Sequence, residues 1–590
     1  MSVPFLLFDD ARDGGAPCRL YQSSVGEIVA HEIDDVAPAL ARLRDAVASG
    51  KHVAGWIAYD AGYALEDKLR PLARSLGTAP SLWFGLFDGY HILDPAERAT
   101  FLGDPAAAWL GPPRPRIDRT AYFAAASRVK EQLLAGDFYQ ANLTFGCDVA
   151  MTGSPLAAYA QMRERSNAGW GGVVRHPGGW LLSLSPEQFF TLRDGVLEAK
   201  PMKGTAPRRA DPSADRAEAD ALAADPKQRA ENLMIVDLLR NDLARVAEPG
   251  SVAVPDLFAV ESFPTVHQMV SRVTARLAAE CDAVGVLETL FPCGSITGAP
   301  KIAAMAALRD LEPEARGAYT GSMGWIEPDG NAAFNVLIRT LEIGDSRGEI
   351  EENASVARLG LGSGLVVDSV VEDEWAECLL KGKFVASDPA EFDLIETMRF
   401  DPEVGIADLD RHLDRLDASA TRFDFPFNRH SARNELQAAT FRRKEPAMLR
   451  LLLSPKGTMA IELKPIPEIP RQPVEVAVRP LPVAADDIRL SHKTTARAFM
   501  EAARAEGGKY ETIFVTPEGQ VTEGSYTSIF VERDGKYLTP PLARGLLPGL
   551  LRARLIEEGK AEEADLTVDD LADGFYIGNV VRGLIRARLV

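Results

Sequence analysis

Short apolar runs separated by glycine-containing turns recur along the chain and predict β-strands. The clearest of these runs are Phe5–Phe8, Val53–Tyr59, Ser81–Leu86, Val474–Val478, Glu511–Val515 and Ser528–Val531. Stretches rich in alanine, leucine and charged residues lie between them, and Pro38 suits the start of a helix over Ala39–Val47. The mixture of the two patterns predicts an α/β protein.

Two breaks in this pattern divide the chain. Residues 111–116, GPPRPR, interrupt it because proline removes a backbone donor and ends helices. Residues 385–390, VASDPA, have the composition of a linker. We expect an N-terminal portion over 1–110, a large unit over 117–384 and a second α/β unit over 391–590. A chain of 590 residues is too long for one core, which agrees with this division.

Composition narrows the class of protein. A net charge of −20 argues against non-specific binding to nucleic acid or to an anionic membrane surface. The start of the chain lacks the basic region of a signal peptide, and no window approaches the roughly 20 apolar residues of a membrane span. The cysteines show no CxxC spacing and are expected to be reduced thiols: Cys18, Cys147, Cys281, Cys293 and Cys378. The sequence predicts a cytoplasmic protein.

The pentapeptide PMKGT (201–205) is the first candidate for chemistry. Lys203 follows a strand-like run over Val196–Lys200, and Gly204 lets the backbone approach a ligand closely. A lysine that is desolvated, or close to another cation, loses part of its positive charge and becomes a nucleophile. Taken alone, the pentapeptide is also compatible with a surface turn.

Three carboxylates are candidates for a metal site. Glu231 lies in the helix-prone run RAENLMIVDLLRNDLAR, and Glu374 and Glu377 are three residues apart on one helical face. Carboxylate oxygens suit a hard cation such as Mg²⁺. Each pattern alone is also that of a solvated helix face.

Two glycine-containing turns are candidate anion sites. The first, CGSITGAPK (293–301), contains Thr297 and Gly298 and leads into a helix over Ile302–Leu308. Backbone N–H groups exposed at such a helix start can bind an anion. The second, LGSGLV (361–366), contains Gly364 and lies just before Glu374.

These residues belong to a longer ordered series of motifs. The series consists of GDFYQANLTF (136–145), SPEQFF (185–190), PMKGT, the Glu231 run, PTVHQMVS (264–271), GSITGAPK (294–301), RGAYTGSMGWI (316–326), FNVLIRT (334–340) and GLGSGLVVDSVVEDEWAE (360–377). Over residues 117–384 it resembles the chorismate-utilising enzymes, which include anthranilate synthase, isochorismate synthase and aminodeoxychorismate synthase component I. The resemblance implies two layers of sheet flanked by helices.

The resemblance also implies the contents of the site. Mg²⁺ would be held by Glu231 and Glu377, with Glu374 adjacent. The carboxylates of chorismate would be bound by Arg339 and by the amides around Thr297, Gly298 and Gly364 in a pocket lined by Tyr319. His267 matches the family's active-site histidine, although by itself it would also fit a structural role.

Two positions select among the reactions of this family. Members that make aminodeoxychorismate carry lysine at the position of Lys203, whereas anthranilate synthases carry alanine. Gln140 stands where isochorismate-forming members carry a water-activating lysine, so addition of water is disfavoured. By resemblance, Lys203 would attack chorismate C2 as the C4 hydroxyl leaves, and ammonia would then attack C4. The chain shows no glutaminase-like cysteine elbow, so a separate glutamine amidotransferase subunit is the expected partner.

The second unit carries another series of motifs. It consists of FDLIETMRF (392–400), LDRHLDRLDASATRFDFPF (409–427), SHKTTARAFMEAAR (491–504), YETIFVTPEGQVTEGSYTSIFV (510–531) and LARGLLPGLLRARL (542–555). This series resembles the fold-type IV pyridoxal phosphate (PLP) enzymes, which include branched-chain aminotransferases and aminodeoxychorismate lyase. The resemblance implies that Lys493 bonds to PLP and Glu523 faces the ring nitrogen. It implies a phosphate site formed by Arg415 and the Leu547-Pro548-Gly549 turn, and a possible homodimer.

The second unit departs from that pattern at two places. Ser528 stands where many relatives carry asparagine, and Asn579-Val580-Val581-Arg582-Gly583 stands where lyases have Ser-Leu between the asparagine and the arginine. The second change removes a hydroxyl that could serve phosphate or substrate.

The two resemblances together imply consecutive reactions. The first unit would make 4-amino-4-deoxychorismate, and the second would remove pyruvate from it to give 4-aminobenzoate for folate. Two alternatives stay open: the second unit could be an amino-acid aminotransferase, or the chain could be a degenerate chorismate-binding regulatory subunit.

Overall fold

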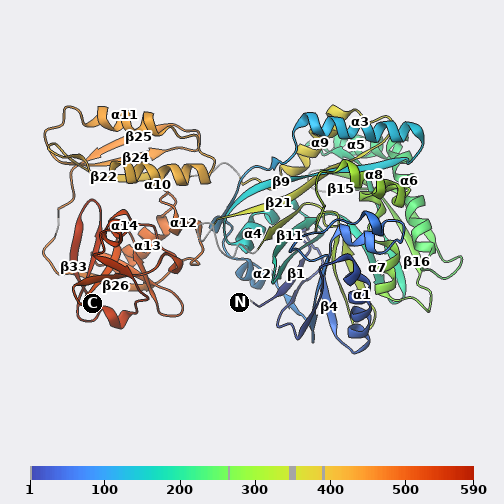
Figure 1. Cartoon of the computed structure of the whole chain (residues 1–590), viewed down its shortest axis with the longest axis horizontal. Coiled ribbons are helices and arrows are strands. Elements are labelled where there is room, and N and C mark those ends of the chain that lie inside the picture. Colours follow the sequence, from blue (N-terminus) through green and yellow to red (C-terminus); the bar gives the residue numbers. More distant parts are fainter. Residues whose placement is uncertain (1–2, 263–265, 345–353, 388–391, 469) are drawn as a thin grey trace.

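The computed structural model describes residues 3–262, 266–344, 354–387, 392–468 and 470–590. It shows a large body that ends near residue 387 and a smaller body that begins at residue 392 (Figure 1). The predicted linker over 385–390 is described only as far as residue 387, and its remaining residues lie outside the described part. In the described part, no helix has the length and apolar character needed to cross a membrane.

The large body contains two extended β-sheets. The strand order of the first is β17 (Gly298–Ala299), β9 (Gln140–Gly153), β21 (Ala354–Leu365), β20 (Thr340–Gly344), β11 (Gly179–Ser185), β10 (Trp170–His176), β1 (Phe5–Asp9), β2 (Cys18–Tyr21) and β6 (His91–Leu93). Two short strands, β7 (Ala108–Leu110) and β8 (Arg114–Pro115), pair with β9 off this path. All of these pairs are antiparallel.

The second sheet carries Lys203 in its edge strand, whereas the sequence predicted this lysine in a turn after a strand. Its order is β14 (Met202–Pro207), β16 (Val266–Arg276), β13 (Val196–Ala199), β12 (Gln188–Arg193), β19 (Ala332–Asn335), β18 (Ser322–Ile326), β4 (His52–Ile57), β5 (Leu82–Phe87) and β3 (Gly26–Ala30). A further strand, β15 (Ala253–Ser262), pairs with β16.

Apolar faces explain how the sheets stack. Trp56 and Trp83 from the second sheet meet Leu6 and Val174 from the first in a core between the layers. The outer faces are covered by α1 (Ile33–Ala48), α2 (Pro95–Leu102), α3 (Arg119–Ala135), α4 (Pro155–Ser166), α5 (Pro212–Ala224), α6 (Pro226–Ala244), α7 (Ala283–Leu290), α8 (Lys301–Leu311) and α9 (Val371–Gly382) (Figure 1). Two further cores lie between sheet and helices, so the expected two-layer sandwich flanked by helices is confirmed.

Residues 3–110 are part of this sandwich, since their strands enter both sheets. The predicted helix is α1, but it begins at Ile33, and Pro38 lies inside it. Glu32 and Asp35 form a capping box that starts the helix before the proline.

The smaller body has two lobes. A four-stranded sheet, ordered β23 (Gly405–Ile406), β22 (Leu394–Asp401), β24 (Ala447–Leu453) and β25 (Met459–Lys464), packs with α10 (Leu409–Arg422) and α11 (Arg429–Thr440). The second lobe has the order β28 (Val521–Gly524), β27 (Glu511–Val515), β26 (Val474–Pro480), β33 (Gly583–Leu589), β32 (Phe575–Asn579), β29 (Ser528–Arg533), β30 (Lys536–Thr539) and β31 (Ala561–Glu563). Its helices are α12 (Ile488–Ser491), α13 (Ala498–Gly507) and α14 (Leu550–Glu557).

The two bodies meet beside the segment that leads to Lys493. Trp109 of β7 packs edge-on against Phe423, with ring centroids 5.5 Å apart, and is only 8% exposed. Arg489 of α12 forms a 2.6 Å ion pair with Asp104. An apolar and an ionic contact therefore join the large body to the small one, and one of them involves the helix just before Lys493.

Replacement of Trp109 by alanine is expected to free α12, because the substitution removes the aromatic side of this junction. Hydrogen exchange measured by mass spectrometry should show faster exchange in the peptide that contains Ile488–Ser491. Trp180→Ala is the matched control, because Trp180 packs against Phe5 within the large body. Equal exchange of this peptide in the two variants would show that Trp109 does not support α12.

Candidate active sites in the two bodies

Lys203 lies in an irregular part of β14. The pairing of β14 with β16 shifts register between Met202 and Thr205, and Gly204 has a left-handed φ of +101°. A Cβ at Gly204 would lie 3.0 Å from Gln228 Oε1 of α6, so glycine permits this close approach. The Lys203 Nζ consequently lies 3.4 Å from Glu231 Oε2 of the same helix, with the lysine side chain 31% exposed.

A buried carboxyl that the sequence analysis missed lies near Lys203. Glu187 is 8% exposed and accepts a 2.7 Å hydrogen bond from Ser295 Oγ. Burial raises the pKa of Glu187, whereas that hydrogen bond and the charges of Lys203 and Lys381 oppose the rise. The arrangement brings the Lys203 amine and a buried carboxyl with a raised pKa to one site. The sequence signal that could have identified Glu187 is a charged residue between two strongly apolar runs, in the motif SPEQFF.

Arg339 is a half-buried cation without a counterion. Burial lowers the pKa of its guanidinium, and no carboxylate among the described residues lies within ion-pair distance. Its φ is +49°, a left-handed conformation that costs a non-glycine residue about 1–2 kcal/mol. A guanidinium held in this way is suited to bind an anion.

The predicted glycine turns meet around Gln140. A Cβ at Gly298 would lie 2.4 Å from the Gln140 backbone oxygen, and one at Gly364 would lie 3.1 Å from Gln140 Nε2. The side-chain oxygen of Gln140 is buried and has no hydrogen-bond partner in the described part of the chain. The Thr297 hydroxyl does not donate to Gln140 but to the Cys293 carbonyl oxygen, at 2.8 Å. The two turns and Gln140 thus form one polar corner of the body.

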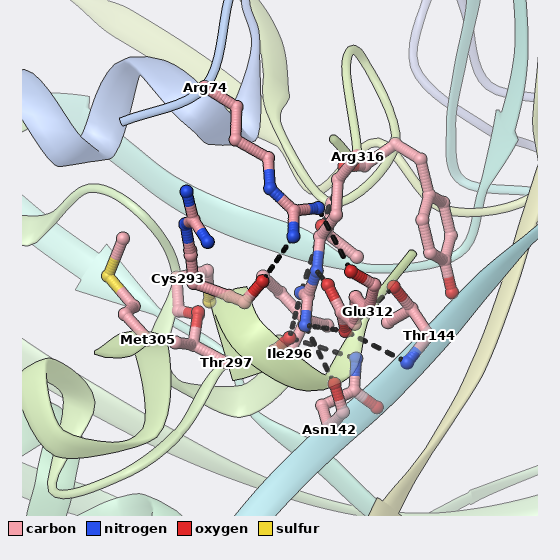
Figure 2. Close-up of polar contacts among 12 residues, drawn as sticks. Arg74, Asn142, Thr144, Cys293, Ile296, Thr297, Met305, Glu312 and Arg316 are labelled. Atoms are coloured by element: carbon pink, nitrogen blue, oxygen red, sulfur yellow. Dashed lines mark hydrogen bonds and ion pairs between the residues drawn. The ribbon is translucent and has the colours of Figure 1, made fainter. Parts of the chain in front are cut away.

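Figure 2 shows the network that fixes this corner. Arg316 forms two hydrogen bonds to the Glu312 carboxylate, at 2.8 and 2.9 Å, and donates to the carbonyl oxygens of Asn142 and Ile296 at 2.7 and 3.1 Å. Although burial opposes it, the Glu312 charge holds the pKa of Arg316 above its usual value. Tyr319 packs against Gly360, where a Cβ would lie 2.0 Å from its ring, and lines a small cavity beside Arg316. Tyr319 therefore lies beside this network.

The three predicted metal ligands are not gathered together. Glu374 accepts a 2.7 Å hydrogen bond from Ser369, and Glu377 pairs with Lys381 at 2.7 Å. Within the described ranges, no group of three or more His, Cys, Asp or Glu side chains could hold a metal ion. The oxygen donors suit Mg²⁺ chemically, but this arrangement does not fit the expected site, and magnesium stays a prediction.

Both ring nitrogens of His267 already have partners. Nδ1 lies 2.8 Å from Ser262 Oγ, and Nε2 lies 3.0 Å from Asp215 Oδ1. Asp215 also accepts from Arg208, whose guanidinium holds the pKa of that carboxyl well below its usual range. These contacts tie β16 to α5, which matches the structural role that the sequence left open.

The smaller body encloses a cavity of about 350 Å³, a size typical of ligand sites. Its lining includes every residue predicted to bind PLP: Lys493, Glu523, Arg415, Leu547 and Gly549. Burial lowers the pKa of the Lys493 amine to about 7, and the charges of nearby arginines add to the effect against the opposing charge of Glu396. The structure therefore brings these predicted residues together around one cavity that fits PLP.

Glu523 is held at two points. Arg497 donates to one carboxylate oxygen at 3.1 Å, and the Leu547 backbone N–H donates to the other at 3.2 Å. Burial raises the pKa of Glu523 to about 7, although Arg497 opposes the rise. Arg497, four residues after Lys493, was not identified from the sequence.

Arg415 is already paired with a carboxylate. It forms two 2.8 Å hydrogen bonds to Glu396 and donates to the Pro548 carbonyl oxygen at 2.8 Å. Ser528 Oγ lies 2.5 Å from where a Cβ would stand at Gly549, the residue before α14. Arg415 thus holds the predicted phosphate-binding turn through the Pro548 carbonyl oxygen, and the Ser528 hydroxyl lies next to this turn.

Comparison with known proteins assigns a family to each body. The model of the chorismate binding enzymes matches residues 16–387. The chain belongs to the chorismate binding enzymes. The model of class IV amino-transferases matches residues 393–590, so the chain joins the two kinds of domain. We refer to them below as the chorismate-binding part and the class IV part.

Similar proteins are known for the chorismate-binding part. The aminodeoxychorismate synthase component 1 of Klebsiella aerogenes is 40% identical over 342 residues, which cover 55% of this chain and 74% of that protein. The protein of the same name from Escherichia coli K12 is 38% identical over 55% of this chain and 73% of its own length. A putative isochorismate synthase, DhbC, from Bacillus anthracis has a TM-score of 0.51 at 20% identity over 65% of this chain and 95% of its own, which shows the fold alone.

Proposed function

We propose that the chain makes 4-aminobenzoate in two steps: amination of chorismate to 4-amino-4-deoxychorismate, then elimination of pyruvate. The observation that carries this proposal is a lysine accompanied by acidic side chains in each part. Lys203 lies beside the carboxyls of Glu231 and Glu187, and Lys493 lies in a cavity with Glu523. The relatives named aminodeoxychorismate synthase component 1 support the first step.

In the first step, the Lys203 amine attacks C2 of chorismate. The C2–N bond forms, both ring double bonds shift (C1=C2 to C1=C6 and C5=C6 to C4=C5), and the C4–O bond breaks. Glu187, a buried carboxyl whose pKa burial raises, is the proton donor to the departing hydroxyl in this proposal. Glu231, 3.4 Å from the amine, takes the proton that Lys203 releases. Ammonia then forms a bond to C4 and expels the lysine from C2, so that one displacement becomes two easier ones.

Arg339 binds a carboxylate of chorismate in this proposal, because it is a half-buried cation without a counterion in the described part of the chain. Arg339→Gln is expected to weaken chorismate binding about 10–100-fold, the usual range for one charge-assisted hydrogen-bonded contact. Calorimetric titration with chorismate measures this directly. Arg309→Gln, which removes a surface guanidinium paired with Asp310, is the matched control. Unchanged binding in Arg339→Gln would remove this residue from the substrate site.

In the second step, PLP, when bound, makes the C4–H of the aminated substrate acidic. Lys493 would hold the cofactor, and its amine would accept the C4 proton. Glu523 would face the ring nitrogen, because Arg497 and the Leu547 N–H fix the orientation of its carboxylate. Loss of the proton is followed by cleavage of the C3–O bond, release of pyruvate and aromatisation.

Ammonia is supplied in this proposal by a separate glutamine amidotransferase subunit, as the name component 1 of the relatives suggests. Free ammonium should replace that subunit in vitro. No step is assigned to Mg²⁺, because its predicted ligands are not gathered.

Product chromatography after incubation of the full chain with chorismate, Mg²⁺, ammonium and PLP tests the proposal. Formation of 4-aminobenzoate and pyruvate would support both steps. Accumulation of 4-amino-4-deoxychorismate alone would mean that the class IV part is not a lyase. Spectral half-reactions with branched-chain amino acids would then test it as an aminotransferase.

A further inference from the structure

The cavity of the class IV part holds more positive charge than the chemistry above uses. Its cationic lining residues are Arg415, Arg450, Lys464, Lys493, Arg497, Arg504 and Arg582, whereas Glu501 and Glu523 are its acidic ones. Carboxylates within the protein neutralise part of this excess. Arg415 pairs with Glu396, Arg497 with Glu523 and Lys464 with Glu462.

Arg504 and Arg582 form a pair around one aromatic ring. The guanidinium carbon of Arg582 lies 4.9 Å from the centroid of the Tyr526 ring, and that of Arg504 lies 5.2 Å from it. Neither arginine has a carboxylate within ion-pair distance among the residues that the structure describes. Arg450 also lacks one but does not share this ring. Because both guanidinium groups stack on the Tyr526 ring, Arg504 and Arg582 lie in the same region of the cavity, and the ring does not neutralise the charge of either.

Arg582 has an incomplete hydrogen-bond shell. Its Nε is buried and has no hydrogen-bond partner in the described ranges. A buried donor of this kind costs about 1–3 kcal/mol unless a ligand pairs with it. The Nε–H of Arg582 needs a hydrogen-bond acceptor. Because the guanidinium groups of Arg504 and Arg582 both lack a carboxylate partner, an anionic acceptor is favoured.

The loop that carries Arg582 is itself well fixed. Asn579 Oδ1 accepts hydrogen bonds from the backbone N–H groups of Val581 and Arg582 at 3.1 Å, and its Nδ2 donates to the Tyr526 carbonyl oxygen at 3.2 Å. Val580 and Val581, which replace the Ser-Leu of lyases, bring no hydroxyl to this loop. The guanidinium of Arg582 is therefore the polar side chain that residues 580–582 offer to an anion.

We propose that Arg504, Tyr526 and Arg582 form a subsite for a substrate carboxylate remote from the reacting amine. The class IV part then selects amino substrates that carry two carboxylates over amino acids that carry one. This inference rests on the proposed function, whose intermediate carries two carboxylates, and it names the residues that distinguish that substrate class.

The probes are isophthalate, a planar dicarboxylate, and benzoate, its monocarboxylate counterpart. Each is titrated into the PLP-loaded full chain while the absorbance of the bound cofactor is followed, since this signal reports only the class IV cavity. Arg582→Gln and Arg504→Gln should each weaken isophthalate binding about 10-fold or more and leave benzoate within about 3-fold. Lys464→Gln is the matched control, because this cation has its own carboxylate partner, Glu462.

Equal losses for both probes, or none, would overturn the subsite. The same holds if Arg582→Gln released PLP without changing the preference for isophthalate, because Arg582 would then hold the phosphate. Arg582→Lys, which keeps the charge but not the planar fork, should recover part of the preference if the variant folds. A wild-type chain that prefers isophthalate yet forms no 4-aminobenzoate would refute the proposed function and leave the subsite standing.

Discussion

A Lys493→Ala chain is expected to convert chorismate and ammonium into 4-amino-4-deoxychorismate at the wild-type rate but to form 4-aminobenzoate at least 10²–10⁴-fold more slowly, the range for loss of a general base. The pKa of Lys493 is lowered to about 7, mainly by burial, so its amine loses a proton more readily than that of an exposed lysine. A neutral amine can both bond to the cofactor and accept a proton from carbon. Alanine can do neither.

Two measurements check this expectation. Chromatography should show 4-amino-4-deoxychorismate accumulating, and the absorbance of lysine-bound PLP should be absent from the variant. Lys509→Ala is the matched control, because Lys509 is an exposed lysine of the same part paired with Glu475. Formation of 4-aminobenzoate by Lys493→Ala at the control rate would show that the elimination does not need this lysine.

The apolar runs of the sequence predicted strands well where both faces of the strand are buried. The strand over Glu511–Val515 has the bounds of β27, and the strand over Ser528–Val531 extends by two residues as β29. The start of α1 was predicted at Pro38, several residues after its actual start at Ile33. The capping box of Glu32 and Asp35 fixes the helix start, although proline is also favoured at a first helical position.

Local motifs in the sequence could single out individual candidate residues, but not the side chains that contact them in the fold. Lys493 and Glu523 were found in this way, but Arg497 and Glu396, which adjust their charge, were missed. Glu187 is separated from Ser295 by more than a hundred residues in the sequence, and only the folded sheets bring them together. Glu374 and Glu377 of α9 show the opposite problem. Their spacing in the sequence suits a metal site, but in the structure Glu374 pairs with Ser369 and Glu377 with Lys381.

Lys203→Ala is expected to stop amination of chorismate while leaving the second step intact. Without the amine, C2 has no nucleophile, so ammonium-dependent formation of 4-amino-4-deoxychorismate should fall about 10²–10⁴-fold, as for loss of a positioned catalytic group. Added 4-amino-4-deoxychorismate should still give 4-aminobenzoate at the wild-type rate, which shows that the class IV part is folded. Lys200→Ala is the matched control, because Lys200 lies three residues earlier and pairs with Glu261 at 2.5 Å.

The products of Lys203→Ala discriminate between mechanisms. Mass spectrometry of the wild-type chain with chorismate, but without ammonium, should detect an adduct on the peptide that contains Lys203, and the variant should lack it. An unchanged amination rate in the variant would mean that ammonia displaces the C4 hydroxyl directly and that Lys203 contributes only its charge beside Glu231. Anthranilate formation by the variant would instead show that the site admits ammonia at C2 once the lysine is removed. That result would support covalent occupation of C2 by Lys203 as the reason that the wild-type chain aminates C4.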